Sequence, residues 1–222
     1  MARVRRLDDL LSDVRLRADN SALDDATITE FINQSITDLY DMLVLAFGDT
    51  YFEVETTRTT SPSLATVALP DDFYKLTGLF WTNGTRKFPI RQVPQLEAEA
   101  FVPGAGWSDY SEVKYRLQIG NLKFYPTPLG IHTVTIKYVP SAVRLVNDPD
   151  TFDGYNGWEE WVVLDAAMKC LEREGNDGDA ALLQPRKDRM EMRIAAMSDR
   201  NEAEPMRIQD IHQAFVWPFE IR

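Results

Sequence analysis

The stretch Asn156-Gly-Trp-Glu-Glu-Trp-Val-Val-Leu-Asp-Ala-Ala-Met-Lys-Cys-Leu-Glu-Arg-Glu-Gly175 decides how this chain can fold. Asn156 is a suitable N-cap, and Gly175 can end a helix in the left-handed conformation. Between them, nearly the whole helix circumference is apolar, which is typical of a helix buried on several sides. The residues that we expect in the core or at a subunit interface are Trp158, Trp161, Leu164 and Met168. The lone acid Asp165 has Lys169 one turn later as its expected partner.

A second long helix is expected to pack against this one. Thr27 and Glu30 have the spacing of a capping box, and Gly48 supplies a stop. Between them, apolar residues recur at three-four spacing. Phe31 and Tyr40 are the members of this face that we single out for the core or a subunit interface.

Two further helices flank this pair. Leucines and a valine predict a short amphipathic helix over residues 6–18. After Gly175, a tight reversal leads into a last helix that ends near Asn201, and we expect Pro185 to kink it or to mark its start.

The hydrophobic period changes to two between residues 51 and 139. Asn83-Gly84 and Gly120-Asn121 predict hairpin turns, and the run 113–119 has apolar residues on one face and polar residues on the other. Residues 71–75 suggest a single turn before a strand at 79–81, and Pro94 a short helix through about residue 101. Because the hairpins leave no room for crossover helices, we predict an antiparallel sheet.

These elements predict an α+β fold. A helical bundle would combine residues 1–50 with a C-terminal helical hairpin, residues 151–204. Residues 51–150 would form an inserted antiparallel β region, as a small sandwich or a barrel-like sheet. Residues 205–222 would form an extended docking tail.

Composition limits the possible functions. The 222 residues carry a net charge of −11, which argues against wrapping nucleic acid phosphates. A single cysteine excludes an intrachain disulfide and a cysteine-based zinc site. The N-terminal segment lacks a signal peptide and no transmembrane stretch follows, so we expect synthesis in the cytoplasm and no membrane partner.

The sequence offers no catalytic set. His132 and His212 lack a partner at metal-ligand spacing, and Cys170 lies on a helix expected to be buried. A calcium loop aligned on Gly154 would place Pro149 at a ligand position, where a carboxylate is needed. We therefore predict no catalytic residue, no metal and no cofactor, and not an enzyme.

The C-terminal segment is rich in large apolar residues without a clear helical or strand period. Such a tail either folds back on its own core or docks on another protein by strand addition or aromatic anchors. The candidate partner-binding residues are Phe215, Val216, Trp217, Phe219 and Ile221.

Several stretches resemble the head-to-tail adaptor (head-completion) proteins of tailed bacteriophages. They are Leu7-Asp-Asp-Leu-Leu, Phe31-Ile-Asn-Gln-Ser-Ile-Thr-Asp-Leu-Tyr-Asp, Leu69-Pro-Asp-Asp-Phe-Tyr-Lys-Leu, the segment from Asp153 to Leu171, and Asp199-Arg-Asn-Glu-Ala-Glu-Pro with the tail that follows. The resemblance spans nearly the whole chain and rests on packing and turn patterns.

The resemblance implies a virion structural protein at the head-tail junction. Such a protein forms a homo-oligomeric ring, typically a dodecamer, beneath the portal protein, extends the DNA channel and gives downstream tail or tail-fibre proteins a docking surface. Genomic DNA would pass through without sequence-specific binding, and the aromatic tail would grip the portal or a neighbouring subunit. Two alternatives stay open: a tail-tube or tail-completion protein of the same particle and, more remotely, a hydrolase or processing enzyme.

Overall fold

The computed structural model describes residues 4–19, 21–62, 64–94, 97, 107, 113–152 and 157–201, with the backbone alone for 198–201. The fold is α+β, with four helices and several open sheets. The helices are α1 (Leu7–Arg17), α2 (Asp25–Phe47), α4 (Glu159–Glu174) and α5 (Asp177–Asn201). The strands are β1 (Arg5–Arg6), β2 (Val54–Thr59), β3 (Thr66–Ala68), β4 (Phe73–Asn83), β5 (Arg86–Pro89), β6 (Arg91–Gln92), β7 (Lys114–Gln118), β8 (Asn121–Tyr125), β9 (Thr133–Pro140) and β10 (Thr151–Phe152).

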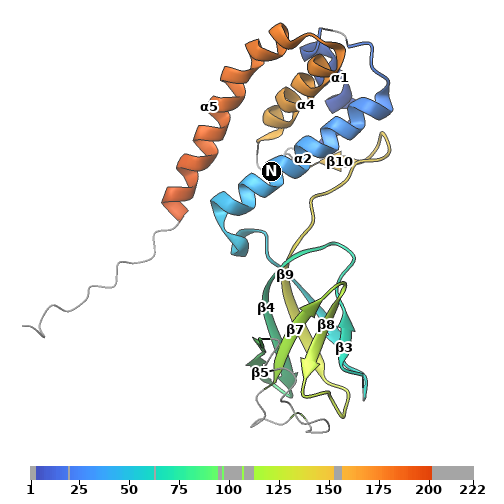
Figure 1. The fold of residues 1–222 in the computed structure, drawn as a ribbon, viewed down its shortest axis with the longest axis vertical. Coiled ribbons are helices and arrows are strands. Elements are labelled where there is room, and N and C mark those ends of the chain that lie inside the picture. Colours follow the sequence, from blue (N-terminus) through green and yellow to red (C-terminus); the bar gives the residue numbers. More distant parts are fainter. Residues whose placement is uncertain are drawn as a thin grey trace, which may run out of the picture.

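The helices gather at one end of the molecule and share one apolar core (Figure 1). Helices α2 and α4 each contact all three of the other helices, so this pair lies at the centre of the group. Ten of the 16 residues of α4 are buried. This burial follows from the apolar circumference of the helix, because a helix without a polar face must be covered on several sides.

Two predicted helix starts are wrong. Helix α2 begins at Asp25 and its N-cap is Asp24; Thr27 lies inside the first turn and donates a hydrogen bond of 2.5 Å to the Asp24 carboxylate. Helix α4 begins at Glu159 rather than directly after Asn156, which lies outside the described residues. Gly157 has a φ of 107°, which no residue inside a right-handed helix adopts, so the helix can begin only after it.

The predicted helix ends agree better with the structure. Gly48 and Gly175 end α2 and α4 with φ values of 77° and 80°. Helix α5, however, continues through Pro185 from Asp177 to Asn201. Proline removes the donor for the carbonyl of Ala181, and because both residues are exposed, water can bind that carbonyl instead.

Two four-stranded sheets occupy the other end of the molecule (Figure 1). Their strand orders are β2-β9-β4-β5 and β3-β8-β7-β6. Side chains from both sheets form a second apolar core, to which β9 contributes Val134 and Ile136 and β8 contributes Leu122 and Phe124. The Asn83-Gly84 and Gly120-Asn121 turns join β4 to β5 and β7 to β8, as predicted.

Three expectations for the β region need correction. The pair β6–β7 is parallel, so the sheets are not purely antiparallel. The predicted turn over residues 71–75 is shorter than expected: the Phe73 amide donates to the Pro70 carbonyl at 3.1 Å across Asp71 and Asp72, and strand β4 begins at Phe73. Leu117 and Ile119 share a face with Val113 in the sequence pattern, yet their side chains are exposed. Most of the helix predicted from Pro94 through about residue 101 lies outside the described residues.

The segment from Ser141 to Asp150 returns the chain from β9 to the helices. The Asn33 side chain of α2 donates to the Leu145 carbonyl and accepts from the Leu145 amide, both at 2.8 Å. Beyond it, β10 pairs with β1, placing Phe152 opposite Arg5. The N-terminal strand therefore fixes the chain just before α4.

Candidate functional site

Helix α5 is attached to the helical core through a narrow apolar contact. Of the side chains described in it, only Ala180 and Ile194 are buried, with Leu183 and Met190 half-buried against the core. Leu182 points into solvent. Because α5 leads directly to the C-terminal segment, the contacts that fix its direction also fix where that segment leaves the fold.

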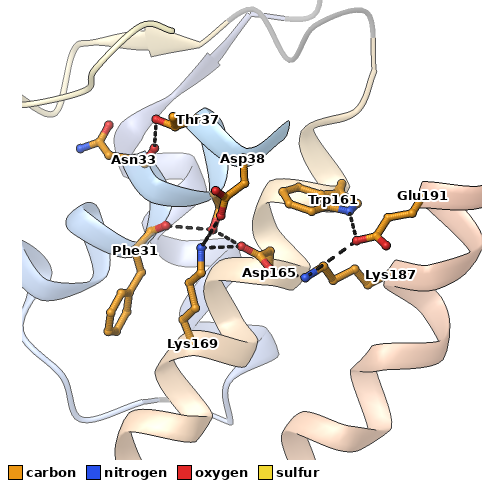
Figure 2. Close-up of polar contacts among 10 residues, drawn as sticks. Phe31, Asn33, Thr37, Asp38, Trp161, Asp165, Lys169, Lys187 and Glu191 are labelled. Atoms are coloured by element: carbon orange, nitrogen blue, oxygen red, sulfur yellow. Dashed lines mark hydrogen bonds and ion pairs between the residues drawn. The ribbon is translucent and has the colours of Figure 1, made fainter. Parts of the chain in front are cut away.

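A buried carboxylate supplies the strongest of these contacts (Figure 2). Asp165 of α4 is 5% exposed and accepts hydrogen bonds from Ser35 Oγ of α2 and Lys187 Nζ of α5, both at 2.6 Å. Lys169 Nζ lies 2.7 Å from the same carboxylate and 3.0 Å from Asp38 of α2. Three helices are thus joined at one acid.

Both members of the expected Asp165–Lys169 pair stay charged. Burial would raise the pKa of Asp165, but hydrogen bonds from Lys169, Lys187 and Ser35 outweigh it and hold the pKa below its ordinary value. Burial would lower the pKa of Lys169, yet hydrogen bonds to Asp165 and Asp38 raise it. The cluster is therefore a structural ion network with its hydrogen-bonding groups satisfied.

Aromatic and charged groups extend the contact along α5. Trp161 Nε1 donates to the Glu191 carboxylate at 3.3 Å, and Lys187 Nζ lies 5.1 Å from the centre of the Trp161 ring. Arg193 lies over the Trp158 ring at 5.6 Å. Such cation–π contacts help to fix the orientation of α5, which buries little apolar surface.

Glu160 gives a third point of attachment. Its carboxylate lies 2.9 Å from Arg17 of α1 and 3.0 Å from Arg186 of α5. One acid in the first turn of α4 therefore joins α1 to α5.

The structure places the selected core or interface residues inside the chain's own fold. Trp158 and Trp161 belong to the helical core, and Leu164 and Met168 are buried in α4. Phe31 is half-buried and packs against the same core. Phe215, Val216, Trp217, Phe219 and Ile221 lie outside the described residues.

Tyr40 lies apart from these residues, where the helices meet the sheets. It forms a small cluster with Val44 and Val139, and its hydroxyl donates to the Pro140 carbonyl at 2.7 Å. Burial, with the nearby Tyr74, Asp41 and Asp72, raises the pKa of Tyr40 to about 12. Tyr40 therefore holds the C-terminal end of β9 against α2.

Sequence reasoning found the Asp165–Lys169 pair but missed Ser35 and Lys187. Lys169 alone cannot fill the acceptor positions of a buried carboxylate, which can take several hydrogen bonds. A single acidic residue on an otherwise apolar helix therefore indicates that other hydrogen-bond donors lie near its carboxylate. Which residues of the chain supply them depends on how the helices pack.

The other residues considered for catalysis or metal binding lie in surroundings that indicate a structural role. Cys170 is buried, and burial raises the pKa of its thiol to about 11. His132 stacks on Trp107 with ring centres 4.8 Å apart, and burial lowers its pKa. Among the residues that the structure describes, no group of three His, Cys, Asp or Glu side chains could hold a metal ion. His212 is not among them.

Asp150, in the acidic segment before α4, closes a turn. Its carboxylate accepts from the amides of Val146 and Asn147 at 2.7 and 2.8 Å, and these bonds lower its pKa. Within the described part of the chain, no helix combines the length and hydropathy that crossing a membrane requires.

Comparison with known proteins provides evidence on the family and the function of this chain. A search of curated proteins finds no match. The family model described as SU10 adaptor protein matches residues 5–209, which include every described helix and strand. The match agrees with the resemblance to phage head-to-tail adaptors. The chain therefore belongs to the SU10 adaptor protein family, a family of structural adaptor proteins of bacteriophages and not of enzymes.

Proposed function

We propose that this chain is the head-to-tail adaptor of a bacteriophage virion, forming a ring beneath the portal protein. The ring, a dodecamer in the proteins that it resembles, would extend the DNA channel and give tail or tail-fibre proteins a docking surface. The observation that carries the proposal is the family match over residues 5–209.

The C-terminal segment is the proposed grip on the portal or on a neighbouring subunit. Helix α5 is held in one direction by Asp165, Glu160 and the two tryptophans of α4. A tail that starts from a fixed helix reaches a smaller volume than one on a free linker, which raises its effective concentration at the docking site. Phe215, Val216, Trp217, Phe219 and Ile221 would supply the aromatic and aliphatic anchors.

We assign different partners to the two ends of the molecule. The helical part, residues 1–50 and 151–204, would lie on the portal side together with the tail, residues 205–222. The β region, residues 51–150, would lie on the tail side. At the end of the sheets away from the helices, the loop between β8 and β9 supports this assignment because it exposes the apolar side chains of Leu129 and Ile131.

The test compares three proteins by light scattering, each alone and mixed with the portal protein. They are the full chain, the variant Phe215→Ala/Trp217→Ala/Phe219→Ala, and the control Leu129→Ala/Ile131→Ala, which removes exposed apolar side chains from a β-region loop. We expect the full chain and the control to form a complex of ring mass with the portal, and the tail variant to stay free.

Equal binding by all three proteins would show that the tail takes no part in the portal contact. A full chain that neither forms a ring nor binds the portal would overturn the adaptor proposal and favour the tail-completion alternative. Binding to a purified tail protein, without the portal, would then be the next measurement.

A further inference from the structure

Strand β2 lies at one edge of the sheet β2-β9-β4-β5. Among the described residues, β9 is its only strand partner. The strand is six residues long, and five of the six are exposed. An edge strand of this kind presents unpaired backbone amides and carbonyls, to which another extended chain can add as a further strand.

The register shows which backbone groups of β2 face the unpaired side. The Thr60 amide donates to the His132 carbonyl at 2.9 Å, which continues the register of β2 with β9. In an antiparallel pair, residues that bond to the partner strand alternate with residues that do not. The amides and carbonyls of Glu55, Thr57 and Thr59 therefore point away from β9. We call these three residues the open edge of β2.

The other edges of the two four-stranded sheets are protected against strand addition. In β5, Lys87 and Pro89 hold the positions that face outward, because the Ile90 amide bonds inward to the Leu79 carbonyl. Proline has no amide to donate, and lysine at an edge disfavours pairing. The edge strands of the second sheet, β3 and β6, have only three and two residues. Strand β2 is longer and contains neither proline nor lysine.

The last residues of the chain have a pattern that such an edge can accept. Residues 205–222 have no clear period as a whole, but large apolar residues occupy alternate positions at Phe215, Trp217, Phe219 and Ile221. Alternation of this kind, with aromatic and β-branched residues, favours a strand. The family match ends at residue 209, so it assigns no role to these four residues.

Pro218 limits how this segment can pair. In a sheet, proline fits only where its position has no ladder hydrogen bond to donate. Pro218 would therefore face away from β2, and Trp217 and Phe219 would bond to the open edge. Directly opposite residues of paired strands share a sheet face, so both aromatic side chains would lie on the face of Thr57. Pro218 would then protect the new edge from further addition.

We propose that the open edge of β2 accepts the C-terminal segment of a neighbouring subunit, with residues 215–221 as the added strand. The inference rests on the proposed function and names the acceptor for the grip on a neighbouring subunit. Helix α5 ends on the side of the molecule where β4 and β5 lie, whereas β2 is the opposite edge of their sheet (Figure 1). A donor on one side and an acceptor on the other make a heterologous contact, which can repeat around a closed ring.

The chain between α5 and the added strand is long enough for this contact. Helix α5 ends at Asn201, and the 13 residues 202–214 precede Phe215. An extended chain spans about 3.3 Å per residue, so these residues reach up to about 45 Å. The segment can therefore start from the helical part of one subunit and reach the sheet of the next.

The first experiment traps the contact with disulfides in the full chain, alone and mixed with the portal protein. Thr57→Cys is combined in turn with one second substitution: Phe215→Cys, Trp217→Cys or Phe219→Cys, and for the controls Val216→Cys or Glu220→Cys. Opposite residues of this kind lie about 5.5 Å apart, within reach of a disulfide. After mild oxidation, we expect at least one of the first three proteins to form covalent chains of several subunits. The two controls, whose second cysteine lies on the other sheet face, should form about fivefold less or none.

The second experiment changes the open edge itself. Thr57→Pro removes an outward amide without removing a hydrogen bond to β9, and Thr57→Val keeps the amide and a β-branched side chain. We expect Thr57→Pro to raise the protein concentration at which the ring forms by about tenfold or more, and Thr57→Val to leave it unchanged. Light scattering measures the ring, and urea denaturation shows whether both variants are folded. If Thr57→Pro is unfolded, the disulfides alone decide.

Rings without disulfides in any of the first three proteins would overturn the proposal, as would normal rings from a folded Thr57→Pro. Disulfides confined to single chains would mean that the segment folds back on its own sheet. Rings of Thr57→Pro that no longer bind a tail protein would assign the open edge to that partner. Either result contradicts the proposal.

The same preparations separate this inference from the proposed function. A portal complex without trapped disulfides refutes this inference alone. Subunits that link through the disulfides but do not bind the portal protein refute the proposed function alone. A chain that does neither refutes both.

Discussion

At the scale of single residues, Asp165 is the acid on which α2, α4 and α5 converge. It is the only acidic residue between Glu160 and Glu172. Its partners Ser35, Lys169 and Lys187 come from all three helices. Removing one member of a buried, hydrogen-bonded ion network leaves the other charges without compensation, which costs more than an exposed ion pair contributes.

We predict that Asp165→Asn lowers the free energy of unfolding by about 2–3 kcal/mol, because the amide cannot compensate two lysines. Asp38→Asn is the matched control: it removes a carboxylate that contacts the same Lys169, but with a side chain 60% exposed, and should cost less than about 1 kcal/mol. Urea denaturation followed by circular dichroism measures both. Similar losses would mean that the network contributes little.

The same residue predicts a pH dependence. Its pKa in the folded protein lies below the ordinary 3.8, so the unfolded chain takes up the proton first as pH falls. The contribution of Asp165 is therefore fully present above about pH 4 and is lost as the pH falls through the folded-state pKa. The stability difference between the unmodified chain and Asp165→Asn should be constant at neutral pH and shrink as the pH falls below about 4; a difference that stays constant down to the acid-unfolding range contradicts the assignment.

At the scale of elements, the sequence predicted those features that depend on hydrophobic periodicity and on glycine positions within a short stretch of the chain. Helices α2 and α4, their glycine ends and the two hairpins follow from patterns within about 20 residues. The N-caps Asp24 and Trp158 were missed because several residues near a helix start can serve as the cap. The choice depends on backbone angles such as that of Gly157.

Long-range pairings could not be read from the sequence. The pair β1–β10 joins residues 5–6 to 151–152, and β6–β7 is parallel across an interval of more than 20 residues. Strands β1, β6 and β10 have only two residues each, which is too short to show a strand period. The partners of Asp165 were missed for the same reason, because Ser35 and Lys187 come from other helices.

An element-scale prediction concerns the segment that returns from β9 to the helices. Asn33→Ala leaves the amide and the carbonyl of buried Leu145 without partners, which should lower the free energy of unfolding by about 2–3 kcal/mol. Gln34→Ala, at an exposed neighbouring position of the same helix, is the control and should be near neutral. Thermal unfolding measures both; a neutral Asn33→Ala would mean that water replaces the amide.

At the scale of the whole molecule, the described residues form three apolar clusters, all of which precede the C-terminal tail in the sequence. The buried residues of the three apolar clusters fall between Leu7 and Ile194. Stability should therefore come from the helices and sheets, while the tail should act on partners.

We predict that deleting residues 205–222 leaves the urea midpoint and the slope of unfolding nearly unchanged, because no apolar cluster loses a described member. The same deletion should abolish portal binding. A clearly lower midpoint would place the tail in the core of the free subunit, the alternative that the sequence left open.

The way the β region joins the helices has one further consequence. The first strand after the helices, β2, and the last strand before the return, β9, are hydrogen-bonded neighbours, with Val54 opposite Tyr138. The Tyr40 hydroxyl then fixes Pro140 to α2. Because the two ends of the β region lie side by side, this region can become longer or shorter, or be replaced by another, without moving the helices that flank it. In the proposed function, a lineage of viruses would change the tail that it carries by replacing the β region, while the helical part on the portal side would stay the same.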